Sequence, residues 1–188
     1  MSTKSHSIFK PTTADLKAAY GKTVPDVIAP RLKVLFVGIN PGLYTAALGH
    51  HFGRPGNRFW PALNAGGFTT RLFTPFEEKQ LLQSGYGISN VVPWATSSAE
   101  ELTSKDFQKG GKILIKKIKK FKPKIVAFLG MGAYRAAFSR PKAKLGAQKE
   151  CFGSTKIWVL PNPSGLNANY QAADFKRLFQ QLWNKAQA

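Results

Sequence analysis

Three short segments of small, stiff and uncharged polar residues are the parts of this sequence that could form a site. They are Gly38-Ile39-Asn40-Pro41-Gly42-Leu43, Pro93-Trp94-Ala95-Thr96 and Pro161-Asn162-Pro163-Ser164-Gly165-Leu166-Asn167. Proline stiffens such a loop, and glycine lets its backbone come close to a ligand. The segments hold no carboxylate, no Ser-His-Asp set and no group of metal ligands, and the first lacks the Gly-Lys-Ser/Thr end of a Walker loop. They predict a rigid, uncharged polar pocket.

A glycine-rich stretch follows the first of these segments. It reads Gly49-His50-His51-Phe52-Gly53-Arg54-Pro55-Gly56-Asn57-Arg58-Phe59-Trp60. Two adjacent histidines are a poor metal pair, so we expect His50 and His51 to face solvent or the backbone. Phe52, an aromatic residue in a glycine-rich loop, could stack on a planar base, whereas Phe59 and Trp60 are typical of the core face of a helix.

Each of the three segments follows an apolar pattern that would position it. Continuous apolar runs at 34–37, 125–129 and 157–160 end at glycine or proline, and 87–92 is a weaker fourth run. Runs without alternation are typical of parallel strands that are buried on both faces. They predict an α/β fold, a three-layer α/β/α sandwich with a central four-stranded parallel sheet. The carboxyl ends of its strands would meet at one edge, where ligands bind.

Helical patterns lie between the strands, at about 13–20, 74–82, 104–121, 131–138 and 172–183. In the third of them, Leu114, Ile115, Ile118 and Phe121 fall on one face. Lysines crowd its other sides: Lys112, Lys116, Lys117, Lys119 and Lys120. This lysine-rich helix is either a solvated basic face or a flank that meets phosphates.

The charge of the chain indicates a polyanionic partner. Its 28 Lys and Arg stand against nine Asp and Glu, which gives a formal charge of +19. Nucleic acid is the simplest polyanion, and an anionic membrane is the competing one. A ribosomal or chromatin protein would share this charge, so the charge alone does not indicate an enzyme.

The single cysteine, Cys151, excludes an intramolecular disulfide and a cysteine-based metal or iron–sulfur site. We expect it to pack beside a strand as a small apolar residue. No apolar run approaches the ~20 residues of a membrane span, and the N-terminus lacks a signal core, so we expect an intracellular protein. Residues 1–30 are expected to form a basic, partly disordered arm, and residues 31–188 the functional domain.

Two motifs together resemble those of the mismatch-specific uracil/thymine DNA glycosylases, a branch of the uracil-DNA glycosylase superfamily. The first comprises Gly38-Ile39-Asn40-Pro41-Gly42-Leu43, His50-His51-Phe52 and Pro55-Gly56-Asn57-Arg58-Phe59-Trp60, and the second is Asn162-Pro163-Ser164-Gly165-Leu166. The segment from Tyr86 to Gly111 also matches in pattern. The resemblance runs from about Leu32 to Trp183, and it implies a uracil-DNA glycosylase-like fold.

The resemblance implies roles for residues of the first motif and its surroundings. Asn40 would be the catalytic residue that positions the attacking water, since an amide cannot act as a general base near neutral pH. Phe52 would stack on a flipped base, and Asn90 with the backbone near Ile39 and Phe52 would bind the edge of that base. Two threonines would also lie close to the site: Thr45, near position 5 of the pyrimidine, and Thr96.

The second motif would bind DNA. Its residues are Asn162, Pro163, Ser164, Gly165, Leu166 and Asn167. A base inside a duplex must be extruded before it can react, at a cost of a few kcal/mol. Leu166 would be the apolar wedge that fills the vacated stack, and Gly165 and Asn167 would meet the orphaned guanine.

The implied activity is that of a monofunctional DNA glycosylase that initiates base excision repair. It would flip uracil, or thymine or ethenocytosine, out of a G mismatch in duplex DNA and hydrolyse the N-glycosidic bond. Neither motif contains a lysine that could form a Schiff base, so no lyase activity is expected. We expect a monomer that acts on double-stranded DNA without cofactor, metal or iron–sulfur cluster, in the cytoplasm or nucleoid of a bacterium or the nucleus of a eukaryote.

The sequence departs from the family pattern at a few positions, and these keep two alternatives open. Pro93 and Trp94 stand where the family usually has an acidic residue and then arginine, and Ala168 stands where the bacterial branch often has arginine. An aromatic residue by the pocket would suit a related glycosylase with another main substrate, such as hypoxanthine or xanthine. The charge alone would suffice for a non-catalytic DNA-binding module.

Overall fold

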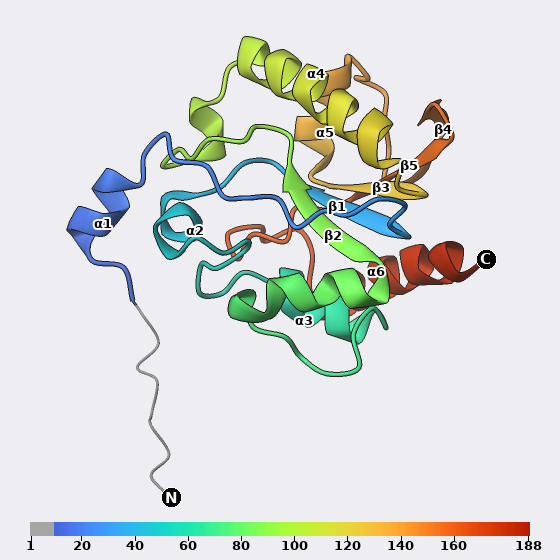
Figure 1. Cartoon of the computed structure of the whole chain (residues 1–188), viewed down its shortest axis with the longest axis horizontal. Coiled ribbons are helices and arrows are strands. Elements are labelled where there is room, and N and C mark those ends of the chain that lie inside the picture. Colours follow the sequence, from blue (N-terminus) through green and yellow to red (C-terminus); the bar gives the residue numbers. More distant parts are fainter. Residues whose placement is uncertain (1–9) are drawn as a thin grey trace, which may run out of the picture.

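The computed structural model describes residues 10–188, which build a five-stranded sheet in the order β2-β1-β3-β5-β4 (Figure 1). The strands are β1 (Val34–Gly38), β2 (Tyr86–Asn90), β3 (Ile125–Leu129), β4 (Gly146–Phe152) and β5 (Thr155–Leu160). All neighbours pair in parallel except β4, which is antiparallel to β5. The four parallel strands are those that the apolar runs predict.

The predicted count of four strands is wrong, because β4 joins the sheet as a fifth strand at its edge. Its residues alternate between half-buried and exposed, so it lacks the continuous apolar run that marks the inner strands. Cys151 lies on this strand and is exposed, so the expectation that it packs in the interior is also wrong. An edge strand covered on one side only leaves such positions in contact with solvent.

Side chains of the parallel strands alternate between two apolar cores, one on each face of the sheet. On β1, Val34 and Phe36 belong to one core, and Leu35 and Val37 belong to the other. Helices α3 (Phe59–Ala65) and α6 (Ala172–Gln187) pack together over the first core. Helices α4 (Ser104–Phe121) and α5 (Met131–Phe138) pack together over the second, so helices flank both faces (Figure 1).

Four further helices of residues 10–188 lie in the connections between the main elements. They are α1 (Thr13–Ala18), α2 (Leu43–Leu48) and the 3-10 helices η1 (Pro75–Ser84) and η2 (Ala99–Glu101). The predicted helices at 104–121 and 131–138 are confirmed, and α6 runs a turn beyond its predicted end. Among residues 10–188, no helix combines the length and the apolar character that crossing a membrane requires.

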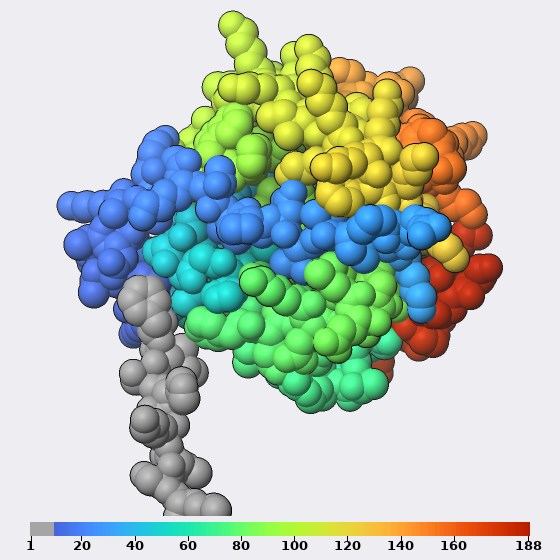
Figure 2. All heavy atoms as spheres, in the orientation of Figure 1, coloured from blue at the N-terminus to red at the C-terminus, as the bar shows by residue number. Residues whose placement is uncertain are grey.

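Residues 10–30 lie against the rest of the domain. Ala19, Val24 and Val27 are buried, and α1 packs on α2. Val27 and Ile88 exchange backbone hydrogen bonds of 2.9 and 2.7 Å, which ties this segment to β2. In Figure 2 the segment, coloured blue, crosses the molecular surface between the green and the yellow parts. The expected arm also covers residues 1–9, which lie outside the described residues.

Candidate active site

A cavity of about 420 Å³ opens at the carboxyl ends of the parallel strands. It lies at the end of β1, which sits between β2 and β3. The strand order changes direction at β1, and α/β sheets bind ligands at such a switch point. Residues with predicted roles line it: Ile39, Asn40, Thr45, Phe52, Asn90, Thr96, Asn162, Ser164, Leu166 and Asn167. Of the predicted set, Pro163 and Gly165 belong to the same loop but do not line this sheet-edge cavity. The structure therefore brings the separate motifs together.

The side-chain amide of Asn40 is held in one orientation. Its Nδ2 donates to the backbone carbonyl of Trp94 at 3.2 Å and to Oγ1 of Thr96 at 2.8 Å. The Thr96 hydroxyl in turn donates to the carbonyl of Ser98 at 2.8 Å, so it can only accept from Asn40. Both protons of the Asn40 amide are thus used. Its Oδ1, which has no protein partner among residues 10–188, remains as a hydrogen-bond acceptor in the cavity.

The aromatic ring of Phe52 forms one wall of the cavity. It stacks on Phe59, with ring centroids 4.0 Å apart and planes at 26°. A Cβ at Gly38 would lie 3.3 Å from Cζ of Phe52 and 2.5 Å from Oδ1 of Asn90, so the last residue of β1 has to be glycine. Phe52 itself has a φ of 53°, a conformation that costs a non-glycine residue about 1–3 kcal/mol. The flat ring of Phe52 is therefore held beside the cavity at a cost in backbone strain.

Asn90, at the end of β2, lines the cavity with its side chain almost fully buried. Only 7% of the residue is exposed, yet its side chain makes no hydrogen bond to any of residues 10–188. The backbone N–H groups of Ile39 and Phe52 likewise have no acceptor in the described part of the chain. Buried polar groups are normally paired, so this cavity offers several donors and acceptors to a polar ligand.

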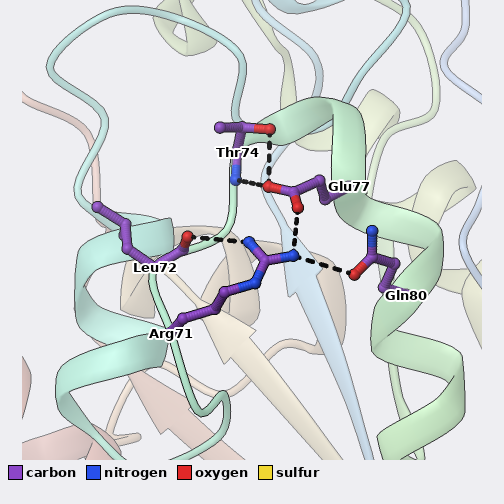
Figure 3. Close-up of polar contacts among 5 residues, drawn as sticks. All are labelled: Arg71, Leu72, Thr74, Glu77 and Gln80. Atoms are coloured by element: carbon purple, nitrogen blue, oxygen red, sulfur yellow. Dashed lines mark hydrogen bonds and ion pairs between the residues drawn. The ribbon is translucent and has the colours of Figure 1, made fainter.

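The loop that carries Phe52 is anchored by a residue that the sequence analysis missed, Glu78. This carboxylate on η1 is 4% exposed, and it accepts from the backbone N–H of His51 at 2.7 Å and meets Nδ1 of His50 at 2.9 Å. The start of η1 is fixed by hydrogen bonds from Thr74 to Glu77, and Arg71 bonds to Glu77 from outside (Figure 3). A loop and a 3-10 helix distant in sequence thus support each other.

His51 lies against the backbone, as the sequence analysis predicts for a loop histidine. Its Nε2 donates to the carbonyl of Pro25 at 3.0 Å, and 1% of the residue is exposed. Burial lowers the pKa of His51 below its usual 6.5, although Glu78 raises it in part. The neutral ring contributes to the cavity wall. Within residues 10–188, no group of three or more potential ligands is placed to hold a metal ion.

Pro93 and Trp94, which the sequence analysis places by the pocket, do not line the cavity themselves. Trp94 contributes to the site through its backbone carbonyl, which accepts a hydrogen bond from the side-chain amide of Asn40. Its ring lies under Nζ of Lys109, 5.4 Å from the ring centroid, and packs on the core beneath α4. The departure from the family pattern at this position therefore changes the outer surface and not the cavity.

The loop of residues 161–170, which contains the second motif, projects beside the cavity. Oδ1 of Asn162 accepts from the N–H of Ser164 at 3.0 Å, and Nδ2 of Asn167 donates to the carbonyl of Asn162 at 2.9 Å. These bonds close the 161–170 loop on itself. Leu166 at its tip is 76% exposed, more than any other large apolar side chain of residues 10–188.

Arg58 connects this loop to the rest of the site, and the sequence analysis did not single it out. Its guanidinium donates to three carbonyls of the 161–170 loop, those of Ser164, Asn167 and Tyr170. Arg58 is the N-cap residue of α3, a position where a positive charge is unfavourable. Its place in the first motif of the resemblance and this local conflict are the signals in the sequence that could have pointed to it.

Comparison with known proteins agrees with this geometry. The chain is similar to a protein of Methanosarcina acetivorans, solved by NMR in solution and described as a candidate uracil DNA glycosylase; the two share 17% identity over 87% of this chain and 98% of the other, with a TM-score of 0.54. At that identity the likeness shows the fold alone. The family model described as the uracil DNA glycosylase superfamily matches residues 25–187, which is most of the sequence. The chain therefore belongs to the uracil DNA glycosylase superfamily.

Proposed function

We propose that this protein is a monofunctional DNA glycosylase that removes uracil from duplex DNA, with a G·U mismatch as its preferred site. The observation that carries this proposal is the fixed amide of Asn40, whose Oδ1 is left as an acceptor in a cavity walled by Phe52. An acceptor so held can orient a water molecule toward a sugar carbon. Family membership gives the reaction class, and the geometry supports the finer statement.

A flipped pyrimidine would find complementary groups in the sheet-edge cavity. Phe52 offers a ring face for stacking, and the unpaired amide of Asn90 offers a donor and an acceptor to the base edge. The free N–H groups of Ile39 and Phe52 are donors for the carbonyl oxygens of the base. Cleavage leaves a pyrimidine anion, which such preorganised donors stabilise as the leaving group.

Catalysis would then rest on positioning and on leaving-group stabilisation. An amide does not take up a proton near neutral pH, so Asn40 cannot activate the water as a general base. Holding the water in line with the bond is its contribution. We accordingly expect a slow enzyme that leaves an intact abasic strand.

Access to the base requires its extrusion from the duplex, and the exposed side chain of Leu166 suits that task. Inserting an apolar side chain into the vacated stack offsets the cost of unstacking. A G·U mismatch lowers that cost further, because its pairing is weaker. We therefore expect a preference for the mismatch on energetic grounds, in addition to any contact of Gly165 and Asn167 with the orphaned guanine.

The test is incubation of the protein with an end-labelled duplex that carries one G·U mismatch, followed by hot alkali. Strand breakage at the uracil only after alkali is the expected result. Breakage without alkali would contradict the monofunctional mechanism, and no release from a folded protein that binds the duplex would contradict the glycosylase assignment. A panel with thymine, ethenocytosine and hypoxanthine then ranks the substrates.

Substitution of Asn40 by alanine is the matching test of the site. The variant should bind the same duplex in a gel-shift assay but release uracil about a hundredfold more slowly, the scale expected when a reactant is misplaced. Leu43→Ala is the control, because Leu43 begins α2 close to Asn40 in sequence but packs on Ala46 and its neighbours and does not line the cavity; this variant should keep its activity. An Asn40→Ala protein as active as the wild type would disprove the role of this amide.

A further inference from the structure

Arg58 makes an unusually dense set of contacts with the 161–170 loop. Its Nη1 donates to the carbonyl of Tyr170 at 2.6 Å, and its Nη2 donates to those of Ser164 at 2.7 Å and Asn167 at 2.6 Å. The guanidinium carbon lies 4.7 Å from the ring centroid of Phe175 on α6. One side chain from the loop before α3 thus holds three points on a loop more than one hundred residues away.

This arrangement is costly by local criteria. The charge sits at the N-cap of α3, where the helix dipole disfavours a cation, and no carboxylate pairs with it among residues 10–188. Its Nε is buried and has no hydrogen-bond partner. Charge-assisted bonds to carbonyls and the contact with Phe175 offset these terms. A side chain placed against local preference in this way suggests a functional demand.

Backbone contacts join the same two segments. The N–H of Arg58 donates to the carbonyl of Pro163 at 2.9 Å. A Cβ at Gly165 would lie 2.6 Å from the carbonyl oxygen of Gly56, so the two chains meet there with no room for a side chain. Phe52 and Arg58 belong to one continuous segment, residues 49–58. The wall of the cavity and the loop that carries Leu166 are therefore mechanically linked.

We propose that Arg58 is a positioning residue that holds the 161–170 loop in the shape in which Leu166 enters the duplex. The proposal rests on the function proposed above and adds to it the part that sets the wedge. An exposed leucine on a free loop would have to be ordered during each insertion, at an entropic cost. With the loop braced in advance by Arg58, that cost is met in the free protein.

A positioning role through Leu166 predicts a pattern that a merely structural role would not produce. Arg58→Gln should lower the rate of uracil release from duplex DNA by about tenfold or more, the scale of one charge-assisted hydrogen bond. Release from single-stranded DNA, which needs no wedge, should stay near the wild-type rate. In a Leu166→Ala background, Arg58→Gln should cause little further loss on duplex, because the wedge is already absent.

Arg71→Gln is the matched control. Arg71 also lies over an aromatic ring, that of Phe73 at 4.6 Å, and also makes hydrogen bonds, but these join it to Glu77, Gln80 and Leu72 on another surface (Figure 3). This variant should leave the ratio of duplex to single-strand rates unchanged. Arg58→Lys keeps the charge but not the forked geometry, and it should fall between wild type and Arg58→Gln.

Equal losses on duplex and single strand, or equal losses with and without Leu166, would overturn the proposal. If Arg58→Gln does not fold, as judged by circular dichroism, Arg58→Lys carries the same comparison. Hydrogen exchange gives a readout that needs no activity: amides of residues 161–170 should exchange faster in Arg58→Lys than in wild type, and unchanged exchange would refute the brace. If the wild type itself releases no base, the proposed function fails while the exchange result still decides on Arg58.

Discussion

Asn40 and Thr96 form a short hydrogen-bond chain that ends at the carbonyl of Ser98. Thr96→Val removes the hydroxyl with little change in shape and frees one proton of the Asn40 amide. We expect uracil release at saturating DNA to slow by about tenfold, since one hydrogen bond contributes ~1 kcal/mol and its loss also lets the amide turn. The Michaelis constant should stay unchanged. Thr96→Ser should restore the rate, and a valine variant with full activity would contradict the chain.

Residue types and order predicted many of the residues that line the cavity, and they did so for a physical reason. Asn40 follows β1 and Asn90 ends β2, and the ends of parallel strands must meet at one edge; Phe52 lies in the glycine-rich loop that follows α2. Arg58 and Glu78 could not be found in that way. Their partners are backbone groups that lie far away in sequence, and any chain position can supply a carbonyl or an N–H.

Among the secondary-structure elements, η1 supports the segment of residues 49–58 through Glu78. Glu78→Ala would leave the buried N–H of His51 without an acceptor, which costs about 1–3 kcal/mol. We expect a matching fall in the free energy of unfolding, measured by urea denaturation, together with weaker base release because Phe52 loses its support. Glu77→Gln is the control. Glutamine can still accept the hydrogen bonds from Thr74, so this change removes only the surface ion pair with Arg71, and surface ion pairs contribute little.

The same segment should respond to acid through His51. Burial lowers the pKa of His51 in the folded state, so the unfolded chain takes up a proton at a higher pH than the folded one does. Stability is therefore full above the unfolded pKa, about 6.5, and falls as the pH drops below it, by at most about 1.4 kcal/mol per pH unit. His51→Gln keeps an N–H for Pro25 and should lose less stability between about pH 7.5 and pH 5.5. The measurement is the melting temperature of both proteins over this pH range. The same fall in melting temperature for both would contradict this prediction.

For the molecule as a whole, the sequence predicts the elements that carry a clear apolar pattern and misses those that do not. The inner strands are apolar throughout, and α4 and α5 carry a clear apolar face, so both classes are found. The edge strand β4 and the six-residue helix α2 have no such pattern, because tertiary contacts hold them in place. Packing of residues 19–27 on the domain likewise depends on a few scattered apolar side chains, among them Ala19, Val24 and Val27.

Part of the positive charge of the molecule lies along one side of α4. Four exposed lysines follow one stripe along α4 at helical spacing, Lys105, Lys109, Lys112 and Lys116, and Lys120 continues it. None of them pairs with an acidic group within residues 10–188. The stripe begins close to Ser97, Ser98 and Glu100, which line the sheet-edge cavity. Its far end lies roughly 20 Å away, at a rise of 1.5 Å per residue.

This placement separates a solvated basic face from a phosphate-binding flank. A duplex that delivers a base to the cavity would pass the near end of the stripe, so we expect Lys105 and Lys109 to meet phosphates and Lys116 and Lys120 not to. Each phosphate contact contributes about 0.9 to the slope of log affinity against log salt concentration. Replacing the near pair by glutamine should therefore reduce that slope by about 1.8, and replacing the far pair should leave it unchanged. Equal slopes for both variants and the wild type would mean that α4 is a solvated face.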